Sequence, residues 1–155
     1  MKFSLDNRTA LVTGGGSGIG RAISRAFAAS GAAVIVLDLD SDAGTSVAQD
    51  ITGNGGVACA VQADVGQMAQ VRAAVELGAK KMNAPDILVN NAGFTRDRSL
   101  TKMTDQEWSG VLSVVLDGAF NCTKAVLPAM RSKGWGRLIN ISSRAYLGKI
   151  GRAHV

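Results

Sequence analysis

The sequence predicts an α/β protein in which helices cover both faces of a parallel β-sheet, a doubly wound arrangement. Three observations lead to this prediction. Short apolar runs alternate with longer segments whose apolar residues recur at helical spacing. The short runs are apolar at successive positions, as in parallel strands buried between two layers of helices. Glycine supplies 19 of the 155 residues and proline only two, which suits many tight strand-to-helix turns and excludes collagen.

Five strands are expected, and each is a short apolar run that ends at a glycine or shortly before a polar residue. They cover residues 9–13, 32–37, 57–61, 86–89 and 137–141. Helices are expected between them, over residues 19–30, 42–52, 68–82 and 105–132. Repeated strand–helix alternation predicts right-handed crossovers in one domain, and the chain carries no linker that would divide it.

The fourth expected helix has the clearest start signal. Thr104 precedes Glu107 by three residues, which is the spacing of a capping box. An apolar stripe at helical spacing follows, and it is expected to be buried. Its members are Trp108, Val111, Val115, Ala119, Cys122 and Val126.

Composition excludes several classes of function. The net charge is +5, from 17 Lys and Arg against 12 Asp and Glu, which is lower than the net charge expected of a nucleic-acid-binding protein. The basic residues near the end of the chain are interpreted as solvated surface. Cys59 and Cys122 have no metal-site spacing, so no metal is expected and a reduced, cytoplasmic protein is predicted. No run approaches the ~20 apolar residues of a membrane span, so no membrane contact is expected.

The turn after the first strand is rich in glycine and is a candidate phosphate site. Glycines allow a tight turn and a close approach of the backbone, while the free N–H groups of the next helix attract an anion. The spacing differs from G-x-G-x-x-G and from the Walker A loop, and a glycine turn without a ligand is the alternative. The candidate residues are Gly14, Gly16, Ser17, Gly18, Ile19 and Gly20.

Asp38 ends the second strand, 18 residues after Gly20. A carboxylate at this place can accept hydrogen bonds from both hydroxyls of an adenosine ribose and would repel a 2′-phosphate. The sequence therefore favours NAD(H) over NADP(H). The alternative is that Asp38 caps the next helix, a role that Asp40 or Ser41 could fill instead.

Four motifs, in order and spacing, resemble those of the short-chain dehydrogenase/reductases. They are Thr13-Gly14-x-x-x-Gly18-Ile19-Gly20, Asp64-Val65, Asn90-Asn91-Ala92-Gly93 and Ile141-Ser142-Ser143. The segment from Asn90 to Asp97, followed by Glu107-Trp108, is particularly similar to bacterial 3-oxoacyl-[acyl-carrier-protein] reductases. The resemblance implies a Rossmann-type sheet of about five strands in this chain and an NAD(P)-dependent oxidoreductase that interconverts a carbonyl and a secondary alcohol.

The resemblance also implies roles for individual residues. The glycine turn would hold the coenzyme pyrophosphate and Asp38 the adenosine ribose, while Asp64 and Val65 would frame the adenine. Asn91, Ala92 and Gly93 would lie beside the nicotinamide ribose, with Asn90 more structural. Ser143 would be the catalytic serine that bonds the substrate oxygen, with Ser142 as the nearby alternative.

Implied partners are a small carbonyl or alcohol substrate, which could be a 3-oxoacyl thioester, and an acyl carrier protein. The longer parent protein is expected to be a homo-oligomer. A non-catalytic NAD-binding module is the alternative function.

Two positions depart from the family pattern. The family's Tyr-x-x-x-Lys motif is absent, because Tyr146 is followed by Ile150 where the lysine should stand. Val115 occupies the position of an asparagine that supports a proton relay, and a valine can neither donate nor accept a hydrogen bond.

The domain is therefore expected to be incomplete. Residues 1–149 are assigned to the dinucleotide-binding domain, and residues 150–155 to an artefactual tail, since that peptide matches a sequencing adapter translated in one frame. The C-terminal part of the family's fold would then be missing. This chain by itself is expected to be inactive, and its exposed apolar face to favour association.

Overall fold

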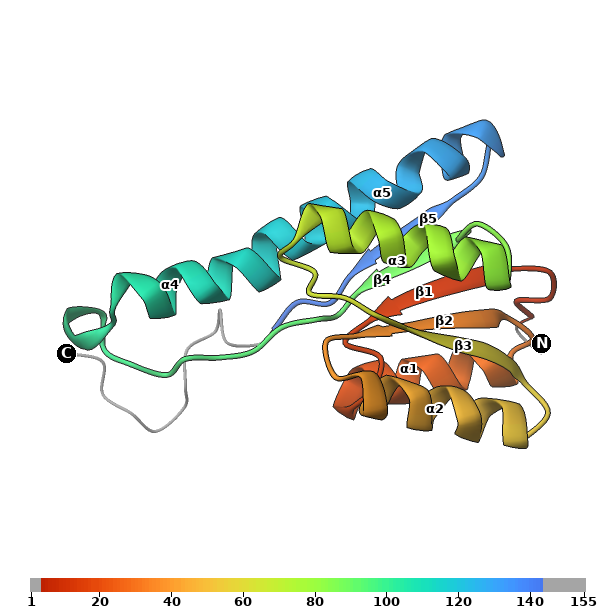
Figure 1. Ribbon diagram of the computed structural model, residues 1–155, viewed down its shortest axis with the longest axis horizontal. Coiled ribbons are helices and arrows are strands. Elements are labelled where there is room, and N and C mark those ends of the chain that lie inside the picture. The colour runs from red at the N-terminus through yellow and green to blue at the C-terminus, as the bar shows by residue number, and fades with distance from the viewer. Residues whose placement is uncertain (1–3, 144–155) are drawn as a thin grey trace.

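The computed structural model describes residues 4–143, and five parallel strands form one sheet within this range (Figure 1). The strand order is β3-β2-β1-β4-β5. The strands are β1 (Thr9–Thr13), β2 (Ala33–Asp38), β3 (Val57–Gln62), β4 (Ile87–Asn90) and β5 (Arg137–Asn140). Strand order reverses direction between β1 and β4, and in such sheets ligands bind outside the carboxyl ends of the strands at this switch point.

Helices pack on both faces of the sheet, which confirms the predicted doubly wound α/β fold (Figure 1). The elements outside the sheet are α1 (Gly18–Ala29), α2 (Ser41–Gly53), α3 (Met68–Lys81), a 3-10 turn η1 (Leu100–Lys102), α4 (Asp105–Leu112), a π-helical turn η2 (Ser113–Asp117) and α5 (Gly118–Ser132). Contacts of α1 and α2 lie on one face, and contacts of α3 and α5 on the other.

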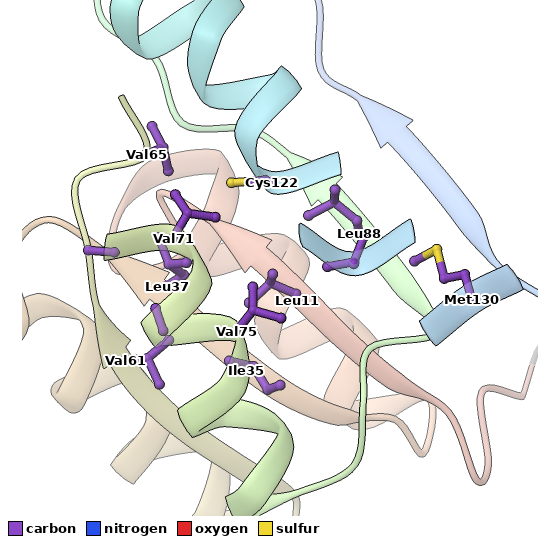
Figure 2. Close-up of a cluster of buried hydrophobic side chains, with 13 residues drawn as sticks. Leu11, Ile35, Leu37, Val61, Val65, Val71, Val75, Leu88, Cys122 and Met130 are labelled. Carbon is purple, nitrogen blue, oxygen red and sulfur yellow. The ribbon is translucent and has the colours of Figure 1, made fainter. Parts of the chain in front are cut away.

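Alternate residues of each strand supply two separate cores. Leu11 and Leu88 point toward α3 and α5, where they meet Val71, Val75 and Cys122 (Figure 2). Their strand neighbours pack on the opposite face against α1 and α2. Continuous apolar strands are therefore needed, because both faces of the central strands are covered.

Cys122 belongs to the core beneath α5 and is fully buried. Burial raises the pKa of its thiol to about 12, so it stays a neutral packing group at physiological pH. Partial burial also raises the pKa of the Cys59 thiol, against a smaller opposing effect from Lys81.

The predicted helix over residues 105–132 is continuous but not uniform, and its stripe is only partly buried. The π-turn Ser113–Asp117 separates α4 from α5. Cys122 and Val126 are buried as predicted, whereas Trp108 is 54% exposed and Val115 is 49% exposed. The expectation that Val115 is a buried packing residue is therefore wrong. For Trp108, Figure 1 gives the reason, because α4 extends past the sheet and has no strand beneath it.

By length and composition alone, the 28 residues Asp105–Ser132 could cross a membrane. The core helix of a globular domain passes the same test, and α5 packs Cys122, Val126 and Met130 against the sheet. We interpret the segment as a core helix on this ground. Asp117 and Asn121 interrupt its apolar run, so the sequence did not suggest a span.

Candidate nucleotide-binding site

A groove of about 470 Å³ opens at the carboxyl ends of β1, β2, β3 and β4. It brings together nearly all the residues predicted to bind a coenzyme. Those that line it are Gly14, Ser17, Gly18, Ile19, Asp38, Asp64, Val65, Asn91, Ala92 and Gly93. The other two, Gly16 and Gly20, do not line the groove, but they contact residues that do.

Two positions in the glycine turn have a geometry that a residue with a side chain would disfavour. Gly18 has φ of +48°, in the left-handed region that favours glycine, and a Cβ there would meet no atom within 4 Å. A Cβ on Gly20 would overlap the carbonyl oxygen of Gly14. The turn therefore folds tightly under the start of α1 and leaves the groove side open.

Helix α1 starts at this turn with its backbone donors available. The first N–H groups of a helix have no acceptor within the helix. Among the described residues no side chain caps α1, although Ser17 stands at the N-cap position, and no acidic residue lies in the first turn. The positive end of the helix dipole is thus not neutralised locally. This donor set fits a phosphate or diphosphate group.

Asp38 lies beside the glycine turn and is held there by backbone amides. Its Oδ2 accepts a hydrogen bond from the Gly16 N–H at 2.8 Å, and its Oδ1 accepts one from the Asp40 N–H at 3.0 Å. Each carboxylate oxygen retains capacity for a further donor. Asp40, and not Asp38, caps α2, because its Oδ1 accepts from the N–H groups of Asp42 and Ala43. The helix-capping alternative for Asp38 is therefore wrong.

Asp64 and Val65 form the wall of the groove after β3. Asp64 Oδ1 accepts a hydrogen bond from the Gly66 N–H at 2.9 Å, which fixes the turn. The Val65 carbonyl accepts one from Asn121 Nδ2 at 2.9 Å. Asn121 is buried, and the sequence analysis gave it no role. A polar residue on the buried side of a helix, next to Cys122, is the signal that could have identified it.

Thr13 connects the glycine turn to the segment after β4. Its Oγ1 accepts hydrogen bonds from the N–H groups of Asn91 and Ala92, each at 3.0 Å, and donates one to the Val89 carbonyl at 3.3 Å. Asn91 Nδ2 donates in return to the carbonyls of Thr13 and Gly14, at 3.0 and 3.3 Å. One wall of the groove is thereby fixed to the other.

Asn90 and Ser143 lie outside this groove. Asn90 is buried, and its Nδ2 donates to Asn140 Oδ1 at 2.9 Å and to Thr123 Oγ1 at 3.3 Å, in line with the structural role expected of it. Ser142 and Ser143 follow β5 and are exposed. Tyr146 and the expected tail at residues 150–155 lie outside the described residues.

The fold and this groove define a class, the Rossmann-type nucleotide-binding α/β proteins. The family model described as short chain dehydrogenase matches residues 8–154, and the chain belongs to that family.

Curated relatives are similar across nearly the whole chain. The 3-oxoacyl-[acyl-carrier-protein] reductase of Synechocystis sp. is 42% identical over 153 residues, 97% of this chain and 62% of the relative. The (2S)-[(R)-hydroxy(phenyl)methyl]succinyl-CoA dehydrogenase subunit BbsD of Thauera aromatica is 37% identical, over 97% of this chain and 60% of the relative. This chain therefore spans about three fifths of the length of these relatives.

A solved structure has the same fold. A gluconate 5-dehydrogenase from Burkholderia cenocepacia, in complex with NADP and tartrate, superposes with a TM-score of 0.86 at 39% identity. The match covers 92% of this chain and 56% of that one.

Proposed function

We propose that the groove binds a nicotinamide dinucleotide, with NAD(H) preferred over NADP(H). The observation that carries this proposal is the hydrogen bond from the Gly16 N–H to Asp38 Oδ2, 2.8 Å long. It places a carboxylate directly beside the glycine turn, the candidate site of the diphosphate, where ribose hydroxyls could donate hydrogen bonds to it. A 2′-phosphate would meet this negative charge, and among the described residues the groove lining contains no lysine or arginine to offset it.

The whole protein would interconvert a carbonyl and a secondary alcohol, with the coenzyme giving or taking the hydride. The relatives named as dehydrogenases and reductases support this reaction class. Two of them, named 3-oxoacyl-[acyl-carrier-protein] reductases, favour a 3-oxoacyl thioester substrate and an acyl carrier protein as partner. Ser143 would donate a hydrogen bond to the substrate oxygen and so polarise the carbonyl.

Lys133 is a weak candidate for docking a carrier protein. Its Nζ already donates to the Ala84 carbonyl at 2.7 Å and pairs with Asp86 at 2.9 Å. Arg131 is exposed and could meet an acidic partner.

A non-catalytic coenzyme-binding module is the second candidate, because binding in the groove needs only residues that line it and needs no catalytic acid. The 155-residue chain would then bind coenzyme without turnover. A longer parent protein that reduces a 3-oxoacyl thioester in a coenzyme-oxidation assay would favour the enzyme; binding without turnover would favour the module.

Isothermal titration calorimetry with NAD+ and NADP+ tests the binding proposal. We expect NAD+ to bind the 155-residue chain at least about tenfold more tightly than NADP+. The repulsion between the Asp38 carboxylate and the 2′-phosphate of NADP+ should cost more than the ~1.4 kcal/mol that corresponds to a tenfold ratio of affinities. Asp38→Asn removes the charge but keeps an acceptor oxygen, and it should bring the two affinities close together. Asp50→Asn, in the distant half of α2, is the matched control and should change neither.

The two parts of the proposal fail separately. Folded chain that gives no heat with either coenzyme would contradict nucleotide binding. Equal affinities, or a stronger affinity for NADP+, would contradict only the preference assigned to Asp38.

A further inference from the structure

Asn121 is a buried polar side chain that reaches the wall of the groove from behind. It lies next to Cys122 on the buried side of α5 and is 6% exposed. Its Nδ2 donates to the Val65 carbonyl at 2.9 Å, across 56 residues of sequence. Val65 lines the groove, whereas Asn121 does not. Any effect of Asn121 on a ligand in the groove must therefore pass through Val65.

The peptide group between Val65 and Gly66 is hydrogen-bonded at both ends. A peptide group is planar, so its C=O and its N–H turn together. The Val65 carbonyl accepts from Asn121, and the Gly66 N–H donates to Asp64 Oδ1 at 2.9 Å. One rigid unit thus connects the buried amide of Asn121 to the carboxylate of Asp64. Rotation of this peptide group would break both bonds, so the bond from Asn121 also fixes Asp64.

Close packing of α5 against this turn brings the two partners together. Gly118 precedes Asn121 by three residues, so the two positions are neighbours on the helix surface. A Cβ on Gly118 would stand 2.7 Å from Val65 Cγ2, which only glycine avoids. The absence of this side chain lets the helix approach Val65 until the Asn121 amide reaches the carbonyl. The wall after β3 therefore has little room to shift toward α5.

The strand order places Asp64 where the base of a bound nucleotide would lie. In the order β3-β2-β1-β4, the glycine turn follows β1, Asp38 ends β2, and Asp64 comes after β3. A nucleotide with its diphosphate at the glycine turn and its ribose at Asp38 would extend its base toward the end of β3. Leu39, Val65 and Val114 give this part of the groove an apolar lining. Asp64 lines it too, and its Oδ2 accepts no hydrogen bond from the described residues, so this oxygen suits a base that carries an amino group.

We propose that Asn121 is a positioning residue for base recognition. Through the peptide group between Val65 and Gly66, it holds the Asp64 carboxylate where the 6-amino group of an adenine can donate to it. This inference rests on the nucleotide binding proposed above for the groove. Without the Asn121 amide, the buried Val65 carbonyl would lose its partner, and the peptide group would turn toward another donor. Asp64 would then lose its fixed position, and the groove would discriminate less between bases.

Isothermal titration calorimetry with NAD+ and deamino-NAD+, in which hypoxanthine replaces adenine, measures this discrimination. Hypoxanthine carries an oxygen in place of the 6-amino group, so it presents an acceptor to the Asp64 carboxylate. We expect the unmodified chain to bind NAD+ at least about tenfold more tightly than deamino-NAD+. Asn121→Leu keeps a similar shape without the donor, and it should reduce this ratio to about threefold or less. A merely structural role of Asn121 would weaken both dinucleotides equally, and an unchanged ratio would overturn the proposal.

Thr123→Val is the matched control on the same helix. It removes a hydroxyl that accepts from Asn90 and does not contact the wall after β3, so the ratio should stay as in the unmodified chain. Asn121→Ser is a milder substitution whose hydroxyl is too short to reach the Val65 carbonyl. It should reduce the ratio as the leucine variant does, and it replaces that variant if circular dichroism shows the leucine variant to be unfolded. An equal reduction in Thr123→Val would also overturn the proposal.

Hydrogen exchange of the Gly66 N–H in the chain without ligand separates this inference from the proposed function. Relative to the core amides of β1, we expect Asn121→Leu to speed this exchange by about tenfold or more, since the bond to Asp64 Oδ1 loses its support. Thr123→Val should leave it unchanged. Unchanged exchange in the Asn121 variants would overturn the inference even if NAD+ binds. If the unmodified chain gives no heat with NAD+, the proposed function fails, and faster Gly66 exchange would still show that Asn121 holds Asp64.

Discussion

Thr13 shows how much of the candidate site depends on one hydroxyl. Its Oγ1 accepts from two backbone N–H groups, those of Asn91 and Ala92, at 3.0 Å each. Replacing Thr13 by valine keeps the shape but removes the acceptor, which leaves both amides without this partner. We expect Thr13→Val to lower the free energy of unfolding by roughly 2–6 kcal/mol, at ~1–3 kcal/mol for each of the two unsatisfied amides. Urea denaturation followed by circular dichroism measures this change.

Thr13→Ser is the matched control, because it keeps the hydroxyl and loses only a methyl group. It should cost about 1 kcal/mol or less, in proportion to that buried methyl. Equal losses for the serine and valine variants would show that the methyl, and not the hydroxyl, stabilises this junction.

The sequence predicted the groove residues better than it predicted the residues that hold them. Gly18, Asp38 and Asp64 were found because local motifs and strand ends mark them, and the structure places all three at one groove. Thr13 and Asn121 act on partners 78 and 56 residues away, so no local pattern reveals their roles. Tertiary contacts of this kind become visible only when the strand order is known.

At the scale of elements, the strands and most helix ends agree with prediction to within one or two residues, because apolar runs and turn residues mark them. Helix 105–132 is the exception, since the π-turn Ser113–Asp117 inserts into its regular ladder. Helical spacing identified Cys122 and Val126 of this segment correctly as buried residues. It could not show that α4 extends beyond the sheet and that the apolar stripe stays exposed there.

The predicted capping box at the start of α4 is present and makes this helix sensitive to acid. Glu107 accepts from the Thr104 N–H at 3.1 Å and pairs with Arg98 at 2.7 Å. The backbone bond from Thr104, and then the bond from Arg98, lower the pKa of Glu107 below its usual 4.5. A lowered pKa means that this stabilisation is complete above pH 4.5 and is lost as the pH falls through the lower value in the folded state.

Hydrogen exchange at the first turn of α4 measures this effect. We expect the Trp108 N–H, which donates to the Thr104 carbonyl at 3.0 Å, to lose protection as the pH falls through the lowered pKa of Glu107, after correction for the intrinsic exchange rate. Glu107→Gln should show reduced protection already at pH 6 and little further change on acidification. Glu76→Gln, at an exposed position of α3, is the control. Unchanged protection of Trp108 down to pH 3 would contradict the assignment.

At the scale of the whole molecule, basic residues near the end of the described chain also stabilise the sheet at the end of its strands opposite the groove. Lys133 pairs with Asp86 at 2.9 Å, and Asp86 Oδ2 accepts from the Thr9 N–H at 2.9 Å. The Trp135 ring lies near two guanidinium groups, those of Arg8 at 3.8 Å and Arg137 at 4.8 Å. These contacts join the starts of β1, β4 and β5, so part of the positive charge has a structural role.

Apolar side chains are exposed along α5, on the π-turn before it, and on β5, one of the two edge strands of the described sheet. Leu116 and Phe120 are 62% and 59% exposed, and Leu138 and Ile139 on β5 are 43% and 38% exposed. An unpaired strand edge and a contiguous apolar surface both promote contacts with other molecules. We expect the 155-residue chain to self-associate at micromolar concentration, and sedimentation velocity at several concentrations measures this.

Charge introduced into the apolar surface should reverse the association. Phe120→Glu places a carboxylate at an exposed position beside Leu116, where burial against a second molecule would require its desolvation. We expect this variant to shift the chain toward monomer by about tenfold in concentration, and 1 M salt should not dissociate the unmodified chain, because the contact is apolar. Leu77→Glu changes another exposed leucine, 46% exposed on α3, and should leave the association unchanged. A sharp monomer boundary for the unmodified chain at all concentrations would refute the predicted association. An equal effect of the two variants would show that the association depends on net charge and not on this apolar surface.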